Sequence, residues 1–406
     1  MKARWWPVSN CTNATTTQSS TTSSRGHLRV LKAEPRRNDG ALSETGIGAL
    51  DLELGGHLDD VTVAWRSWGR LNERGDNAVI VLHALTGDSY AAGEGGWWEP
   101  VIGPGRPIDT DHQFVICSNV LGGCQGTTGP SSVNPESGKP WAMHFPLVTI
   151  GDMVNAQRRL LGSLGVTSVI PIGGSIGGLQ ALEWATRHAD LVRGSGVVAA
   201  SGALGAQAIA LHGEVGRRAI MADANWRNGD YASHGVFPEE GLSIARMAAM
   251  ITYHSRDSLN TRFGRTPASR PVLYPGIGPT FDVEGYLHYH GQALVQRFDA
   301  NSYLYLTRAM DMYDVSRNGD GESWLREVQV PMLLIGISSD WLFPPEDIRT
   351  LTANLQRLGA DASYQEIESP NGHDSFLKDW DQLNAIVGPF IADLGSQEKH
   401  SREARS

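Results

Sequence analysis

A serine set among glycines is the residue of this chain best suited to chemistry. The stretch 169–185 reads VIPIGGSIGGLQALEWA, in which Gly173, Ser175 and Gly177 form the pattern G-x-S-x-G. This pattern is typical of a nucleophile elbow, a strained strand-to-helix turn that exposes the serine hydroxyl to a base. The N–H of Ile176 would lie at the helix N-terminus, where it can stabilise an oxyanion. A glycine-rich turn without chemistry has the same five letters, but the apolar patterns on both sides favour the elbow.

A serine nucleophile needs a base and a group that orients the base. In the chain order typical of α/β hydrolases, an acid and then a histidine follow the serine. Asp340 comes after the apolar run 330–337, and His373 comes after the run 362–367. One histidine among 13 carries little information, whereas this order, with each residue behind a strand, is specific. The sequence therefore predicts a triad of Ser175, Asp340 and His373.

The loop ALTGD, which follows the apolar run 77–83, is expected to supply a second oxyanion donor, the N–H of Leu85. These residues indicate acyl transfer or hydrolysis through an acyl-serine, and they leave open whether water or another molecule accepts the acyl group. Only three cysteines occur, Cys11, Cys117 and Cys124, and no C-x-x-C pair or His/Cys cluster predicts a zinc site. We expect no metal, no resident cofactor and no disulfide framework.

Strand and helix patterns alternate around these residues. Continuous apolar runs are typical of central parallel strands, and they occur at 77–83, 113–119, 169–172, 192–200 and 330–337, with a last strand expected at 362–367. The alternating pattern at 61–68 predicts a half-buried edge strand. Helical spacing predicts helices over 152–164, ending at Gly165, and over 376–394. The sequence thus predicts an α/β fold of the hydrolase type, with a mostly parallel central sheet and helices on both faces.

One block interrupts this alternation. Residues 201–325 show mainly helical patterns and loops, and they fall between two predicted sheet strands. We expect them to form a helical lid over the sheet edge where ligands bind, inserted into a core made of 41–200 and 326–395. A second independent domain is the alternative, which is disfavoured because no Pro/Gly linker isolates both ends. Residues 1–40 are expected to be a disordered extension, and 396–406 a frayed tail.

Composition excludes several classes of function. The net charge is −10, so nucleic acid is not an expected partner, and no apolar run is long enough for a membrane helix. The few cysteines fit a reducing compartment, which favours the cytoplasm. The first acidic residue is Glu34, and the basic, Ser-rich stretch before it also fits an organellar transit peptide, a solvated tail or a misassigned start.

Motifs along most of the chain resemble those of a known family. In order they are HALTGDSY, WWEPVIGPGRPIDT, NVLGGCQGTTGPSS, HFPLVTIGDMV, GGSIGGLQALEWA, NWRNGDY, GLSIARM, TYHSRDSLNTRFGR, QRFDANSYLYLTRAMDMYD and GHDSFL. They resemble the homoserine O-acyltransferases, enzymes of methionine biosynthesis with the α/β-hydrolase fold, from about residue 40 to about residue 394. The resemblance implies acyl transfer from an acyl-coenzyme A to the hydroxyl of L-homoserine by a ping-pong route. It also implies a homodimer built through the lid helices.

The resemblance assigns further roles where motifs match. Ser175, Asp340 and His373 correspond to the family's nucleophile, acid and base. Arg246, in GLSIARM, corresponds to the arginine that holds the homoserine carboxylate, a task that suits the two parallel hydrogen bonds of a guanidinium. Asp374 corresponds to the residue that holds the amino group. By composition alone, Arg246 would be read as a surface helix residue and Asp374 as a loop cap.

Two positions depart from the family pattern, which usually has methionine at Ile176 and serine at Thr128. A β-branched Ile176 could narrow the acyl pocket, although its backbone N–H is kept. These departures leave room for a paralogue with another acceptor, such as the deacetylcephalosporin acetyltransferases, or for a serine esterase.

The acyl donor is expected to be acetyl-CoA rather than succinyl-CoA. The sequence most closely resembles acetyl-transferring members, and the ALTGD loop carries Asp88 and no Arg or Lys. That carboxylate would repel the carboxylate of a succinyl group. If succinyl-CoA were used instead, Arg262 and Arg265 would be the first cations to test.

Overall fold

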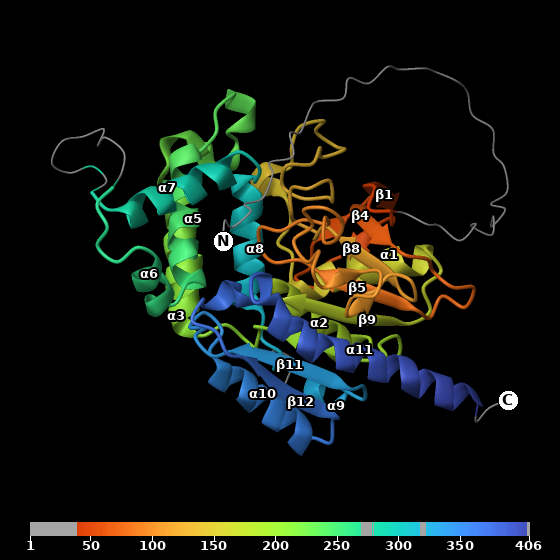
Figure 1. Cartoon of the computed structure of the whole chain (residues 1–406). Coiled ribbons are helices and arrows are strands. Elements are labelled where there is room, and N and C mark those ends of the chain that lie inside the picture. Colours follow the sequence, from red (N-terminus) through yellow and green to blue (C-terminus); the bar gives the residue numbers. More distant parts are fainter. Residues whose placement is uncertain (1–38, 269–277, 279, 317–321, 404–406) are drawn as a thin grey trace, which may run out of the picture.

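The central element is an eight-stranded sheet, seen in the computed structural model, which describes residues 39–268, 278, 280–316 and 322–403 (Figure 1). Its strands lie in the order β1 (Ser43–Gly46), β4 (Thr62–Trp68), β8 (Phe114–Ser118), β5 (Ala78–Leu82), β9 (Val169–Gly174), β10 (Ser195–Val198), β11 (Met332–Ile337) and β12 (Ala362–Ile367). All neighbours from β8 to β12 are parallel, whereas β1–β4 and β4–β8 are antiparallel. The predicted mostly parallel sheet is therefore confirmed.

Helices cover both faces of this sheet. On β5 the side chains of Ala78, Ile80 and Leu82 pack into one core with α1 (Ile150–Ser163), α2 (Ile176–Arg187) and α10 (Pro345–Arg357). Val79 and Val81 point the other way, into a core formed with α11 (Trp380–Glu403), which runs along the sheet in Figure 1. Burial on both faces explains why these strands read as continuous apolar runs.

The edge position predicted for 61–68 is wrong. β4 lies between β1 and β8, and Val63, Ala64 and Trp65 are buried one after another. β1 has the sequence SETG, without an apolar pattern, and for this reason no strand was predicted outside β4. Two small ribbons were also not predicted, β2 (Leu50–Asp51) with β3 (His57–Leu58), and β6 (Ile102–Gly103) with β7 (Ile108–Asp109).

The chain between β10 and β11 is mainly helical, as expected. It contains α3 (Ala206–Ala208), η2 (Ile209–Val215), α4 (Gly216–Ala222), η3 (Ala224–Gly229), η4 (Ala232–His234), α5 (Glu239–Tyr253), α6 (Arg256–Arg262), α7 (Asp282–Val295), α8 (Ala300–Met312) and α9 (Ser323–Arg326). α5 packs against α4 and α7, and this layer stands to the left of the sheet in Figure 1. We call 201–316 the lid, because α9 packs instead on α10 and α2 of the core.

The helix ends differ from the predicted ones at the C-terminus. α1 begins after a capping box of Thr149 and Asp152 and stops before Gly165, whose φ of 82° suits a helix stop. After the short 3-10 helix η5 (His373–Leu377), α11 continues to Glu403 rather than ending near residue 394. Most of the tail expected to be frayed is therefore helical. The expected disordered extension, apart from residues 39 and 40, lies outside the described residues.

The turn between β9 and α2 has the geometry of a nucleophile elbow. Ser175 has φ 61° and ψ −126°, a left-handed conformation that is strained for a residue with a side chain. Its N–H donates to the carbonyl of Val198 at 3.0 Å. A Cβ at Gly173 would lie 2.5 Å from the carbonyl oxygen of Leu82, and one at Gly177 would collide with the same oxygen. Only glycines allow the elbow to approach the end of β5 this closely.

We predict opposite effects for two Gly→Ala substitutions. Gly177→Ala should destabilise the fold by about 1–3 kcal/mol or more, because its Cβ meets backbone that cannot rotate away. Gly162→Ala, in the exposed part of α1 with open space around it, should stabilise the fold by about 0.5–1 kcal/mol. Urea unfolding measures both. Equal losses of stability would contradict the steric argument.

Candidate active site

His373 and Asp340 form a buried pair at the carboxyl ends of β12 and β11. The Nδ1 atom of His373 lies 2.6 Å from Oδ2 of Asp340, and both side chains are almost fully buried. The other carboxylate oxygen of Asp340 accepts the N–H groups of Leu342 at 2.9 Å and Phe343 at 3.0 Å. These bonds fix the carboxylate, which in turn fixes the tautomer of His373 with its proton on Nδ1.

The Nε2 atom of His373 is buried and makes no hydrogen bond within the described part of the chain. A buried nitrogen without a partner at a strand end is a functional candidate, because structural histidines are normally satisfied. Burial lowers the pKa of His373, but the charge and hydrogen bond of Asp340, with a smaller contribution from Asp374, raise it above its usual value. His373 can therefore act as a base near neutral pH.

Phe376 connects His373 to the elbow. Its ring lies against Gly174, where a Cβ would be 2.5 Å away, and contacts the ring of His373 edge-on with 5.6 Å between centroids. Ser175 therefore lies on the same side of the sheet as the buried histidine. No direct hydrogen bond joins Ser175 to His373 among the described residues, a common situation for catalytic pairs without substrate.

The lid docks onto the loop that carries His373. Trp341 donates its indole N–H to the carbonyl of His254 at 2.8 Å, and the Ser255 hydroxyl donates to the carbonyl of Pro370. Gly372, with φ 77°, lies so close that a Cβ would be 2.6 Å from the nitrogen of Ser255. The lid thus closes over the carboxyl ends of the strands, where this class of sheet binds ligands.

The ALTGD loop lies beside the elbow because Leu82, which Gly173 and Gly177 contact, is the last residue of β5. Within the loop, the N–H of Gly87 and Nδ1 of His83 both donate to the carbonyl of Ala84 at 2.8 Å. Leu85 is therefore held in a tight turn next to the first turn of α2. This placement is suitable for oxyanion donors from Leu85 and Ile176.

Two arginines from the lid hold Thr86, the residue after Leu85. Arg246 of α5 donates to the Thr86 hydroxyl at 3.3 Å, and Arg297, after α7, donates to the Thr86 carbonyl at 2.6 Å. Arg297 was not among the predicted site residues, although it lies in the motif QRFDANSYLYLTRAMDMYD. The ALTGD loop itself carries no Arg or Lys, but the lid brings Arg297 to it, and the charge of Arg297 interacts with Asp88.

Arg246 and Asp374 are brought to the same side of the site as His373. The guanidinium of Arg246 lies over the ring of Tyr253, at 5.3 Å from its centroid, and the ring of Tyr253 lies 5.9 Å from that of His373. Asp374 directly follows His373 and pairs with Lys378 at 3.3 Å. One positive and one negative side chain therefore flank the base.

The charged groups around Asp374 determine its ionisation state. Burial raises the pKa of a carboxyl, but the positive charges of Lys378, His373, His254 and Arg246 together hold the pKa of Asp374 below its usual value. It is therefore ionised at neutral pH and can accept hydrogen bonds from an ammonium group.

The two departures from the family pattern have structural roles. Thr128 pairs with Thr62 of β4, donating its N–H to the carbonyl and accepting the Thr62 N–H on its hydroxyl, both at 2.9 Å. The side chain of Ile176 is fully buried in the core between the sheet and α2. Both side chains contribute to the packing of the core, and the effect of Ile176 on an acyl pocket stays a prediction.

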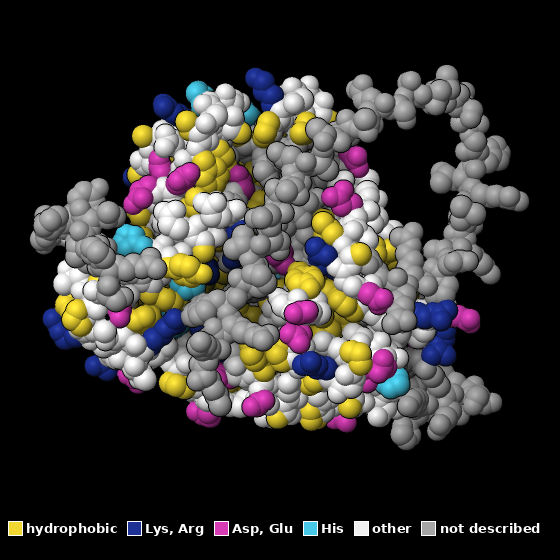
Figure 2. Space-filling model, turned by 45° about the horizontal axis from the view of Figure 1, so that its top comes forward, with side chains coloured by type: hydrophobic (Ala, Val, Ile, Leu, Met, Phe, Trp, Pro, Cys, Tyr) yellow, Lys and Arg dark blue, Asp and Glu magenta, His cyan; other side chains and the backbone are white. Residues whose placement is uncertain are grey.

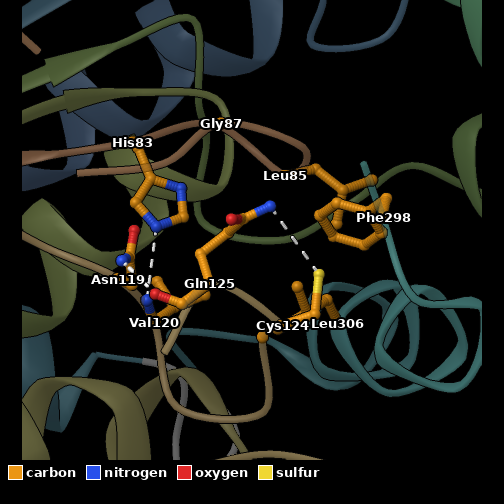
Figure 3. Close-up of a pocket in the computed structure, with 10 residues that line it drawn as sticks. His83, Leu85, Gly87, Asn119, Val120, Cys124, Gln125, Phe298 and Leu306 are labelled. Carbon is orange, nitrogen blue, oxygen red and sulfur yellow. Dashed lines mark hydrogen bonds between the residues drawn. The ribbon is translucent and has the colours of Figure 1, made fainter. Parts of the chain in front are cut away.

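A narrow pocket opens beside the candidate oxyanion donor (Figure 3). Leu85 and Gly87 border it from the ALTGD loop, Cys124 and Gln125 from the loop after β8, and Phe298 from the lid.

No group of three or more His, Cys, Asp or Glu residues within the described ranges could hold a metal ion. No helix within the same ranges is both long and apolar enough to cross a membrane.

Comparisons with known proteins agree with this geometry. Residues 77–379 match the alpha/beta hydrolase fold family. A homoserine O-acetyltransferase of Carboxydothermus hydrogenoformans is 46% identical over 353 residues, which are 84% of this chain and 92% of that protein. The chain belongs to the homoserine O-acetyltransferase family.

Solved structures show the same fold with two activities. The crystal structure of homoserine O-acetyltransferase from Bacillus anthracis matches with a TM-score of 0.81 and 27% identity, over 86% of this chain and 97% of that chain. Esterase E22 matches with a TM-score of 0.78 and 27% identity, over 86% of this chain and all of that chain. The homoserine O-acetyltransferase family therefore shares its architecture with esterases.

We predict a coupled effect of Asp340→Asn on activity and pH dependence. A neutral Nε2 is the active form of the base, so activity falls as pH drops through the pKa of His373, which Asp340 raises. Removing the carboxylate should lower kcat/KM about 10⁴-fold and move the acidic limb to lower pH. The measurement is kcat/KM against pH with p-nitrophenyl acetate, with the exposed Asp347→Asn as control. An acidic limb that stays in place in Asp340→Asn would show that His373 is not the titrating base.

Proposed function

We propose that this protein transfers an acetyl group from acetyl-CoA to the side-chain hydroxyl of L-homoserine. The observation that carries the proposal is the arrangement around His373: its Nε2 makes no hydrogen bond, one cation, Arg246, lies on the far side of the Tyr253 ring, and one anion, Asp374, is the next residue along the chain. A free amino acid carries a carboxylate and an ammonium group, which these two charges complement. The names of the curated relatives support acetyl as the group and homoserine as the acceptor.

In the first half-reaction Nε2 of His373 takes the proton of the Ser175 hydroxyl while the serine oxygen attacks the thioester carbon. The resulting oxyanion is stabilised by the N–H groups of Leu85 and Ile176. The tetrahedral species collapses, His373 returns the proton to the departing sulfur of CoA, and an acetyl-serine remains. Asp340 stabilises the imidazolium that forms on the way.

In the second half-reaction homoserine replaces CoA. Arg246 holds its carboxylate and Asp374 its ammonium group, so that its side-chain hydroxyl lies at the acetyl carbon. His373 takes the hydroxyl proton while the hydroxyl oxygen of homoserine attacks the acetyl carbon. When the tetrahedral species collapses, the acetyl group is transferred to homoserine, and His373 gives the proton to the oxygen of Ser175. The product would be O-acetyl-L-homoserine, in keeping with the place in methionine biosynthesis that the resemblance implies.

Ester hydrolysis is the second candidate function, favoured by the structural match to esterase E22. The two functions share the acetyl-serine and differ in what attacks it. Holding homoserine by both charges raises its effective concentration far above that of a free solute, which favours transfer over hydrolysis. Succinyl-CoA is disfavoured as donor because the names of the curated relatives give acetyl as the transferred group.

We predict that the native enzyme mixed with acetyl-CoA gains an acetyl group by intact mass, and that Ser175→Ala does not. Adding L-homoserine should remove the adduct rapidly and yield acetylated homoserine, whereas buffer alone should remove it slowly. Succinyl-CoA under the same conditions is expected to give little adduct. An adduct on Ser175→Ala would exclude Ser175 as nucleophile, and equal decay with and without homoserine would establish hydrolysis instead.

We also propose a homodimer formed through the lid. Ile244 and Ile251 are both about 40% exposed and lie seven residues apart on one face of α5, and Tyr289 of α7 is 59% exposed. In Figure 2, exposed apolar side chains interrupt the charged surface. A second copy of the chain would cover such a face.

Light scattering tests the dimer. The native chain should have twice the mass of one copy, and Ile251→Asp should shift it toward the mass of a single copy. The matched control is Leu54→Asp, because Leu54 is 55% exposed but lies outside the lid. A native protein with the mass of one chain would contradict the proposal.

A further inference from the structure

The helix that opens the lid contains a π-helical segment. Helical backbone runs without interruption from Ala206 to Ala222, with α-helix at both ends and the π-helix η2 at Ile209–Val215 between them. Wider π turns are uncommon, and they are frequent at functional sites. Such a turn changes the direction of the side chains that it carries relative to a regular helix.

Close packing fixes the register of this π segment. A Cβ at Gly213 would lie 2.8 Å from a carboxylate oxygen of Asp311 on α8 and 3.0 Å from a guanidinium nitrogen of Arg217. Arg217 and Asp311 form an ion pair at 2.6 Å, and both side chains are more than nine-tenths buried. The side chain before Gly213, that of His212, is therefore held in one direction.

His212 points at the candidate acceptor site. Its ring is 1% exposed, its Nε2 lies 3.0 Å from the hydroxyl oxygen of Tyr253, and the two rings are 5.6 Å apart. Burial, and then the charges of His373, Arg246 and Arg217, lower the pKa of His212 to about 3. His212 is therefore neutral at any working pH.

The hydroxyl of Tyr253 lies between His212 and Arg246. Burial raises the pKa of Tyr253 to about 12, against the opposing effect of the charge of Arg246, so the phenol keeps its proton. The guanidinium of Arg246 lies 5.3 Å from the centroid of the Tyr253 ring and can only donate, so its charge favours a phenol oxygen turned towards it and leaves the O–H to donate to Nε2 of His212. Arg246 in turn donates to the Thr86 hydroxyl, next to Leu85.

We propose that His212 is a positioning residue for the acceptor: it accepts a hydrogen bond from the Tyr253 hydroxyl, and so turns the phenol oxygen toward Arg246 and holds the guanidinium in place for the substrate carboxylate. The proposal rests on the proposed function, because it assigns Arg246 to the acceptor. It predicts a role in the second half-reaction and none in the transfer of acetyl to Ser175. A histidine that only fills space would affect both half-reactions or neither.

His212 is expected to contribute to the binding of homoserine the free energy of one buried hydrogen bond. Removing the acceptor while filling the same volume, as in His212→Phe, should raise KM for homoserine about 3- to 10-fold. The burst of CoA released in the first half-reaction should stay within about twofold of the native burst. His212→Gln, whose amide oxygen can take the place of Nε2, should recover part of the loss.

A double-mutant cycle separates positioning from packing. Tyr253→Phe keeps the ring and removes the hydroxyl, so combining it with His212→Phe should raise KM for homoserine no further than Tyr253→Phe alone. His188→Phe is the control, because His188 is also a histidine with a lowered pKa, packed on Trp184 at the end of α2 away from the site. Its KM should equal that of the native enzyme.

Imidazole ¹⁵N spectra give a readout that does not depend on activity. Between pH 5.5 and 8, His212 should remain neutral with its proton on Nδ1, and Tyr253→Phe should shift its Nε2 signal. A proton on Nε2, or an Nε2 signal that ignores Tyr253→Phe, would overturn the proposal. This measurement needs no substitution at His212, so it holds even where a His212 variant folds poorly.

The kinetic measurements also test the positioning role of His212. An unchanged KM in His212→Phe, an equal loss of the CoA burst, or additive effects in the cycle would each overturn the positioning role. Arg246→Ala serves as the reference, and it should raise KM for homoserine steeply while the burst persists. If Arg246→Ala left KM unchanged, the acceptor assignment in the proposed function would fail; if only His212→Phe were inert, the present inference alone would fail.

Discussion

The close approach of the elbow to the end of β5 is the constraint on which the rest of the site depends. Gly173 and Gly177 let the backbone of β9 and α2 come against the carbonyl of Leu82, and Ser175 takes a left-handed conformation between them. The same contact places the first turn of α2 beside the ALTGD loop. The candidate nucleophile and both candidate oxyanion donors are thus positioned by backbone packing alone, which is more rigid than an arrangement of long side chains.

The core and the lid divide the chemistry between them. Core strands carry Ser175, Asp340 and His373 at their carboxyl ends, whereas Arg246, Tyr253 and Arg297 come from the lid. The lid reaches the core machinery at two places, the Thr86 turn and the loop before His373. A movement of α5 would therefore displace Arg246 and the Thr86 turn together, and in the proposed function this would couple binding of the acceptor to the geometry of the candidate oxyanion donors.

Sequence patterns were sufficient to predict an element or a candidate site residue where one physical requirement determines its sequence. Strands buried on both faces, such as β5 and β11, have the continuous apolar runs that a central strand requires, and the three candidate triad residues follow strands in a fixed order. β1 was missed because an outer strand needs neither apolar residues nor alternation, and its absence made β4 look like an edge. The π turn at His212 could not be predicted from the sequence for a related reason. It depends on the contact of Gly213 with Asp311, two residues almost 100 positions apart in the chain. Arg297 was likewise one basic residue among many until the fold placed it on Thr86.

The fold alone does not decide between transfer and hydrolysis, since homoserine O-acetyltransferase and esterase structures both match this chain closely. In the proposed mechanism the buried pair of His373 and Asp340 would activate an incoming hydroxyl in the same way whether it belongs to water or to an alcohol. Transfer and hydrolysis differ in whether the site can bind an alcohol in competition with water, which is present at a much higher concentration. Near the candidate base the described residues hold one cation, Arg246, across the Tyr253 ring, and one anion, Asp374, next to His373 in the chain. In the proposed function these two residues select the acceptor, so the same core could serve either reaction when they change.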